Sequence, residues 1–502
     1  MLLLIGGSAY ASEFDFYASL DSEAVMNSTT NAGGITSSKV GYKSDFLITG
    51  NKADAGGTQL LSLGLSLGNN LGVGRRTVAL TSLKWEKTAH NYRLKLGDVL
   101  ESFSQYSLSS SYKGLSFTYI LPGNRGLELT FAGGYAYPRW ENIYAGDEVV
   151  AVAREVKGLK LTSGPSTSGT IYGASIVSSI DKKGITAGDN LYDNLVYAVD
   201  AEFIPIPGLT VRSVAAFAST SEKTNNAQFS GNAIRLDASS AAKQGRAVFE
   251  YERVSPGFMA VMGSAVADRE KVKLRITSNH TKTLTSTVGY LYTRDNLERK
   301  KAKTTVSHKP EVKIDLRRPF DRRYADISAS VKFDIKRIDG STVAGNTVSL
   351  SYEDRFGPID TAVTISRSSN GTGRQEMNYL AEVSTRTELG AATLSPVLRF
   401  NIITDGNAAT ANIADTALDL RVDLPSSNIN SSIKVGQQRS TTVSANPKKT
   451  YADLAVYYRP GYLTGLRDGR ISLRANHIGY SYTDASQDRA ETSVKIGVSL
   501  SW

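Results

Sequence analysis

Apolar and polar residues alternate strictly along many short stretches of this sequence. The stretch 271–276 is typical, because Val272, Leu274 and Ile276 alternate there with basic residues. The same pattern recurs in residues 61–67, 312–317, 327–336, 418–424 and 454–458. A period of two places successive side chains on opposite faces of an extended strand, and no comparable helical spacing is sustained in any window. The sequence therefore predicts an all-β chain whose strands each have one apolar and one polar face.

Short turns centred on proline or glycine separate these stretches. They are Pro122-Gly123, Pro207-Gly208, Arg318-Pro319, Gly357-Pro358, Leu389-Gly390, Leu424-Pro425 and Arg459-Pro460-Gly461. In the second half of the chain they recur about every 35 residues, which is the length of two strands, one tight turn and one longer loop. We therefore expect successive hairpins, with tight turns at one end and longer loops at the other. The polar stretches 137–146, 180–194 and 221–243 are the candidates for longer loops.

The strand length and the charged faces favour a single membrane-spanning barrel over a soluble fold. Each stretch has about 9–12 residues, which is the length of a tilted strand that crosses a bilayer. A soluble β-sandwich or propeller is the alternative, but it would not sustain charged faces over more than about twenty long strands. Residues 12–502 contain no linker-like segment. We expect one antiparallel up-and-down barrel of about 26 strands, within a range of 22–26, with short periplasmic turns and longer outer loops.

Composition excludes several other classes of protein. Only 40% of the residues are hydrophobic, which excludes a helical membrane protein but suits a barrel with a polar interior. Cysteine is absent, so the chain cannot form disulfides or thiolate metal sites. None of the four histidines belongs to a metal-binding motif, and the glycine-rich stretch 164–170 lacks the lysine of a phosphate-binding loop. We expect no enzyme activity, no catalytic residues, no cofactor and no metal site; a barrel hydrolase assembled from distant residues is a third hypothesis.

The two ends of the chain indicate its destination. The last strand closes on an aromatic residue, in the pattern Lys495-x-Gly497-x-x-Leu500-x-Trp502. This ending resembles the carboxy-terminal signal of Gram-negative outer-membrane β-barrels, which is recognised by the barrel-assembly machinery. The resemblance implies location in the cell outer membrane and contact with outer-membrane lipid and lipopolysaccharide. At the other end, residues 1–11 have an apolar run and Ala9-x-Ala11, so we interpret them as a signal-peptide remnant.

The charged faces of the strands give the candidate functional residues. The charged side chains expected to line the lumen are Arg93, Lys95, Lys271, Lys273, Arg275, Lys332, Asp334, Lys336, Arg399, Asp419, Arg421 and Arg474. Residues expected to form a basic rim are Arg299, Lys300, Lys301, Lys303, Arg317, Arg318, Arg322 and Arg323. The rim could contact lipid phosphates, an acidic partner or entering anions; we do not expect nucleic acid, because stacking aromatics are not interleaved there.

The alternation of apolar and polar residues is interrupted at Asn476-His477. The interruption predicts a β-bulge there, with Tyr480 on the outer face.

Two functions fit these features. The first is a porin-like channel for small polar solutes, whose basic lumen favours anions, in keeping with the net charge of +10. The alternative arises from size, because barrels of 16–18 strands already leave an aqueous channel and 22-strand transporters carry a plug. A wider barrel would need an infolded loop or a protein partner in its lumen. The chain could then be the sheath of a multi-protein outer-membrane complex, such as a cytochrome electron conduit or an export machine.

Overall fold

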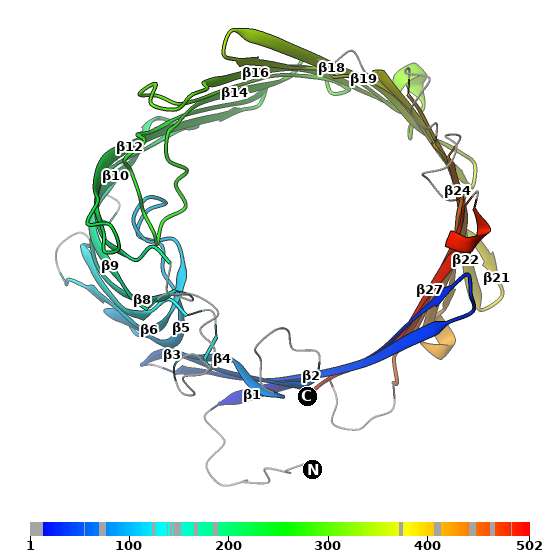
Figure 1. Ribbon diagram of the computed structural model, residues 1–502, viewed down its shortest axis with the longest axis horizontal. Coiled ribbons are helices and arrows are strands. Elements are labelled where there is room, and N and C mark those ends of the chain that lie inside the picture. The colour runs from blue at the N-terminus through cyan, green and yellow to red at the C-terminus, as the bar shows by residue number, and fades with distance from the viewer. Residues whose placement is uncertain are drawn as a thin grey trace.

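The alternating stretches form one continuous antiparallel sheet that closes on itself (Figure 1). The computed structural model describes residues 14–54, 56–69, 77–122, 126–137, 139–140, 143, 152–164, 169–183, 189–370, 375–405, 413–440, 448–461, 467–482 and 484–502. The expected signal-peptide remnant, residues 1–11, lies outside the described residues.

The strands follow one another around the ring in chain order. They are β1 (Asp15–Asn31), β2 (Thr36–Asp54), β3 (Gly57–Gly68), β4 (Val78–Thr88), β5 (Tyr92–Leu100), β6 (Ser111–Ile120), β7 (Glu128–Tyr135), β8 (Ala153–Thr162), β9 (Ile171–Lys183), β10 (Tyr192–Ile206), β11 (Leu209–Glu222), β12 (Gln228–Ala242), β13 (Gly245–Val254), β14 (Arg269–Asn279), β15 (Leu284–Asp295), β16 (Thr305–Arg317), β17 (Asp326–Ile338), β18 (Ser341–Phe356), β19 (Ile359–Ser369), β20 (Gln375–Thr385), β21 (Thr387–Leu389), β22 (Ala392–Asp405), β23 (Ile413–Leu424), β24 (Ile429–Ser440), β25 (Lys448–Tyr458), β26 (Asp468–Ser481) and β27 (Arg489–Ser501). Because β20 and β21 both pair with β22 and are separated only by Arg386, they count as one strand of the wall, and the barrel has 26 strands.

The last strand closes the barrel. Strand β27 pairs with β1, with Leu500 opposite Leu20, and the Trp502 amide donates to the Ala18 carbonyl over 2.9 Å. All seven predicted tight turns connect strands at the end where Trp502 lies. Longer connections, such as 101–110, 136–152 and 255–268, join strands at the opposite end. The longest connections therefore lie at the predicted loop end, although Asp339-Gly340 forms a two-residue turn at that end and the connection between β25 and β26 at the other end spans 459–467.

The outer face of the barrel is apolar. Large apolar side chains on this face remain exposed on every side of the ring, among them Phe217, Ile276, Val312, Leu350, Phe400 and Ile496. Such a band suits hydrocarbon, whereas the closed hydrogen-bonded wall leaves no backbone edge exposed to lipid. No helix in the described part of the chain has the length and apolar character needed to cross a membrane.

Two local predictions are wrong. The polar stretch 221–243 is not a loop, because most of it is β12, which pairs along its length with β11 and β13. Small and polar residues lie on both faces of β12, and Ile234 and Leu236 are the large apolar residues of its outer face, so the strand has little of the hydrophobic alternation that marks the others. The predicted β-bulge at Asn476-His477 is absent, since β26 pairs in unbroken register with β25 and β27. As a result Tyr480 lies on the inner face, where Arg489 covers its ring at 4.6 Å.

Two connections fold into the ring and line one side of it (Figure 1). We call residues 101–110, between β5 and β6, the first inner loop, and residues 255–268, between β13 and β14, the second inner loop. They hold each other by backbone hydrogen bonds, in which Ser264 N donates to Gln105 O over 2.8 Å and Ser109 N donates to Met262 O over 2.9 Å. Both loops start from the end of the barrel with the longer connections.

The inner loops are fixed by an apolar core inside the lumen. Phe103 and Leu108 from the first loop and Met262 from the second are buried together, and Tyr106 packs edge-on against Phe258. The wall beneath them is built of small and β-branched residues, namely Ala132, Val156, Val177, Val196, Ala198, Ala216, Ala218, Ala233 and Val254. Burial of each large side chain contributes about 1.5–3 kcal/mol, so the loops are a packed part of the fold.

Candidate functional site

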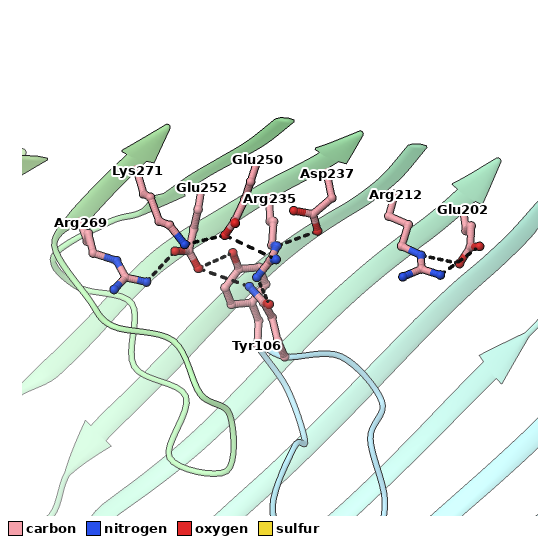
Figure 2. Close-up of polar contacts among 10 residues, drawn as sticks. Tyr106, Glu202, Arg212, Arg235, Asp237, Glu250, Glu252, Arg269 and Lys271 are labelled. Carbon is pink, nitrogen blue, oxygen red and sulfur yellow. Dashed lines mark hydrogen bonds and ion pairs between the residues drawn. The ribbon is translucent and has the colours of Figure 1, made fainter. Parts of the chain in front are cut away.

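The inner wall next to the inner loops carries a ladder of opposite charges (Figure 2). Arg235 on β12 contacts Asp237 over 2.7 Å and Glu250 on β13 over 3.4 Å. Lys271 on β14 contacts the same Glu250 carboxylate over 2.7 Å. Further along the wall, the Arg212 guanidinium and the Glu202 carboxylate form a bidentate ion pair, with a shortest N–O distance of 2.7 Å. Because paired residues on adjacent strands share one face, the ladder braces the wall across five strands.

The ladder also anchors the first inner loop. The buried Glu252 carboxylate accepts from the Tyr106 hydroxyl over 3.1 Å and from the Arg269 guanidinium over 2.6 Å (Figure 2). Gln105 donates to the same carboxylate over 3.3 Å and accepts from Arg235 over 2.5 Å. Burial and the charge of Glu252 raise the pKa of Tyr106, so its hydroxyl stays protonated and remains a donor at neutral pH.

Beyond the loops lies a hollow of about 700 Å³ on the inner wall. We call it the basic hollow, and its charged lining consists of Lys271, Lys273, Arg275, Lys309, Lys332 and Lys336 together with Glu311 and Asp334. Four of these bases have acidic partners: Lys271 contacts Glu250, Lys309 and Lys336 contact Asp334, and Lys332 contacts Glu311. Lys273 and Arg275 have no ion-pair partner among the described residues. The hollow is therefore the most basic part of this wall segment.

The opposite side of the inner wall has a different balance of charge. Arg399 is paired with Glu382 over 2.7 Å, and Arg421 lies 3.5 Å from Asp419. Arg474 lies over the ring of Tyr457 at 5.4 Å. The acidic residues on the inner face of β23 are Asp415, Asp419 and Asp423. Basic side chains on the inner face thus form one group at β14–β17, and a second group that includes Lys434, Arg470, Arg474 and Lys495 lies on β24–β27.

The uncovered side of the inner wall is open to solvent. The side chain of Lys332 is 57% exposed and that of Arg421 is 62% exposed, although these residues lie far apart around the ring. Under the inner loops, by contrast, Glu252 is only 3% exposed. The described part of the chain therefore covers one side of the lumen and leaves the charged remainder accessible.

The strand register places all twelve predicted lumen residues on the face that carries Glu252. Direct pairs connect them step by step, for example Glu252 with Lys271, Glu311 with Lys332, and Glu382 with Arg399. On the other side of the pairing between β27 and β1, Arg93 and Lys95 share this face with Thr118 and Ser116.

The apolar core beneath the inner loops was not predicted from the sequence. Its signal was present in the aromatic, leucine and methionine residues of 101–110 and 255–268, which a solvated outer loop would not need.

The predicted basic rim is divided between the two ends of the barrel. Arg299, Lys300, Lys301 and Lys303 connect β15 to β16 at the end of the longer loops, whereas Arg317, Arg318, Arg322 and Arg323 lie at the end of the tight turns. In the second group, Arg322 contacts Asp354 over 2.8 Å and lies over the Phe356 ring at 4.1 Å.

One residue of the first group holds the second inner loop. Lys301 contacts the buried Asp268 over 2.5 Å, and the Leu297 amide donates to the same carboxylate over 2.7 Å. Burial acts to raise the pKa of Asp268, but these two hydrogen bonds outweigh it and bring the pKa below its ordinary value. The connection between β15 and β16 is thereby attached to the second inner loop.

In the ranges that the structure describes, no group of three or more His, Cys, Asp or Glu residues could hold a metal ion. His308 contacts the Tyr290 hydroxyl over 2.8 Å and His477 contacts Thr492 over 2.9 Å, and the register places both histidines on the outer face. The arrangement can attract, bind and orient charged solutes.

Comparisons with known proteins show the fold. No family model matches the sequence, and no curated protein matches it. Among solved structures, the E. coli P pilus tip assembly intermediate PapC-PapD-PapK-PapG matches with a TM-score of 0.51 and 12% identity, over 96% of this chain and 60% of that chain. The P pilus usher (PapC) translocation pore has a TM-score of 0.43 and 12% identity, over 96% and 99% of the two chains. The ferric citrate transporter FecA has a TM-score of 0.38 and 10% identity, over 96% and 78%.

These likenesses concern architecture alone. Together with the closed wall, the apolar outer face and the charged inner face, the likeness to the P pilus tip assembly intermediate shows the architecture of a large transmembrane β-barrel.

Proposed function

We propose that this chain is an outer-membrane channel for small polar solutes and that its inner wall favours anions. The observation that carries the proposal is the charged inner face from β14 to β27, which stays accessible to solvent because the inner loops cover only the other side. A 26-strand barrel is wider than the porins of 16–18 strands, which already conduct. The concentration of basic residues at β14–β17 supports the anion preference.

Ion conductance in planar bilayers tests this function. Purified protein in a KCl gradient should give large, steady steps, and the reversal potential should show that chloride permeates better than potassium. A reversal potential on the potassium side would refute the anion preference. Absence of steady conductance from protein that shows heat-modifiable gel mobility would refute the open channel.

A second function is favoured by the width of the barrel. The two inner loops pack against β5–β13, and much of the inner wall of a 26-strand barrel remains accessible. A partner protein seated against this wall would make the chain the sheath of a multi-protein outer-membrane complex, either an export machine or an electron conduit that supplies its own cofactors. Purification from native membranes under mild detergent distinguishes the two functions. A stoichiometric partner together with little conductance favours the sheath, whereas a lone conducting barrel favours the channel.

A further inference from the structure

We infer that the basic hollow is a binding site for solutes that carry two or more anionic groups, such as polycarboxylates or polyphosphates. The inference rests on the proposed channel in one respect, because the solute must enter the lumen to reach the hollow. It goes further by placing selectivity at one position on the wall and by naming the chemical class of the solute.

Strand β14 carries more basic charge on its inner face than the neighbouring strands compensate. This face presents Arg269, Lys271, Lys273 and Arg275 in succession. On β13, Glu252 and Glu250 lie opposite Lys271 and Lys273, and on β15 Asp295 lies opposite Arg269, but the residues opposite Arg275 are the uncharged Val248 and Gly289. A wall braced only for stability would place an acid beside Arg275, as happens at Glu382 and Arg399, because a base without a counter-charge is repelled by the bases next to it.

Two bases of this row remain available to a solute. Glu250 contacts Lys271 and Arg235, and Glu252 contacts Arg269. Lys273 lies opposite Glu250, whose carboxylate is already shared by two other bases, and neither Lys273 nor Arg275 forms an ion pair in the described ranges, so an anionic solute would supply the counter-charge. Arg275 contributes the planar fork of donors that fits a carboxylate or a phosphate group.

The bases of the hollow are too far apart for one small anion to reach them all. Alternate residues on a strand lie about 7 Å apart, and strands β14 and β17 are about 14 Å apart across the wall. The lysines of β16 and β17 that border the hollow are held by only two acids, Glu311 and Asp334. A single small anion could reach only one or two of these bases. A solute with several anionic groups could reach Lys273, Arg275 and the border lysines together, and the volume of about 700 Å³ is ordinary for a small-molecule site.

Block of chloride current provides the test. The probes are tricarballylate and tripolyphosphate, and acetate and inorganic phosphate are their single-group counterparts. We expect the multi-group probes to block the parent channel at lower concentrations than the single-group anions. Block by tricarballylate alone would identify polycarboxylates as the solute, and block by tripolyphosphate alone would identify polyphosphates.

Two double variants locate the site. Lys273→Gln with Arg275→Gln should weaken the block at least about tenfold, which corresponds to loss of one good ionic contact. The matched control is Lys434→Gln with Arg421→Gln, which removes two inner-face bases outside the hollow and should leave the block unchanged. Equal block in both double variants, or no block of the parent channel, would overturn the inference.

Binding measured without permeation separates this inference from the proposed channel. If the purified protein does not conduct, titration calorimetry of tripolyphosphate and tricarballylate into detergent-solubilised protein still examines the hollow. Binding that is lost in the Lys273/Arg275 double variant and kept in the control supports the site even though the channel has failed. Conductance that favours anions, with no binding of either probe, overturns the site and leaves the channel standing.

Discussion

Tyr106, at the turn of the first inner loop, donates its hydroxyl hydrogen bond to the buried Glu252 of β13 over 3.1 Å. The two residues are far apart in sequence, and their contact fixes the loop against the inner wall. The Tyr106 ring also packs on Phe258 of the second inner loop at 5.8 Å between centroids. One side chain therefore couples both inner loops to the charge ladder.

Replacing Tyr106 should release the inner loops and leave the barrel intact. Truncation of a large buried aromatic side chain costs about 3–5 kcal/mol of stability. In Tyr106→Ala this loss should destabilise the packed inner loops and not the barrel wall, because the strands of the wall are held by their own hydrogen bonds. Limited proteolysis in detergent should cleave residues 101–110 and 255–268 faster, with heat-modifiable gel mobility unchanged. Tyr106→Phe keeps the packing and should cost only about 1 kcal/mol. Equal protease resistance in Tyr106→Ala would show that the loops do not depend on this contact.

Acid should loosen the attachment of the second inner loop to the β15–β16 connection. The pKa of Asp268 in the folded chain is below its ordinary value of about 3.9, so the ionised form contributes stability above that value. This contribution is lost as the pH falls through the lowered pKa, and neutral or mildly basic pH should have no effect. Hydrogen exchange of residues 255–268 should rise only below about pH 4. Asp268→Asn should show fast exchange already at pH 7, and unchanged exchange in that variant would contradict the role of the ion pair.

Close approach of β6 and β7 should make Gly114 intolerant of a side chain. Gly114 lies opposite Gly134, and a Cβ atom at Gly114 would come within 2.1 Å of the Gly133 carbonyl oxygen. Gly114→Ala should therefore destabilise the barrel by about 1–3 kcal/mol and lower the temperature at which the folded gel band disappears. Gly289→Ala is the control, since the nearest atom there, Glu311 Cβ, is 3.6 Å away. Equal unfolding temperatures would mean that the two strands can separate to accept the methyl group.

Loss of the terminal aromatic side chain should impair assembly more than stability. Trp502 lies on the outer face at the end of β27, where its backbone still pairs with Ala18. If the ending is a barrel-assembly signal, Trp502→Ala should reduce the folded protein recovered from outer membranes, and Trp502→Phe should restore it. The unfolding temperature of the protein that does assemble should change little. Normal recovery of Trp502→Ala would reject the signal and leave Trp502 as an interfacial anchor.

Sequence reasoning succeeded where the period of two persists and both faces have clear chemistry. Lys271 to Ile276 shows the alternation without interruption, and the turns at Pro207-Gly208 and Gly357-Pro358 identify the end of the barrel at which they lie. It failed at residues 221–243, because a strand that faces a crowded lumen can carry small polar residues on one side and little hydrophobicity on the other. The break in alternation at Asn476-His477 was also wrongly interpreted as a β-bulge, because apolar residues stop alternating there although the strand continues in register.

The inner loops could not have been derived from strand patterns. Phe103, Tyr106 and Phe258 are apolar residues in connections that would be solvated if they pointed outward. The wall partners of Tyr106, such as Ala216 and Ala233, lie several strands further along the chain, so the match appears only when those strands have paired into the wall. The basic hollow has the same origin, because its bases come from β14, β16 and β17 and meet only through the register.

The pairing of β1 with β27 also determines when the barrel can form. The seam joins Ser19 to Ser501, so the contact that completes the wall spans almost the whole length of the chain. Such a contact has the highest loop-closure cost and cannot form before the last strand has been synthesised. Until then the chain carries two unpaired strand edges, which are templates for aggregation. A nascent chain of this kind must be held by a chaperone from its first strand to its last, and premature termination anywhere should yield an insoluble product.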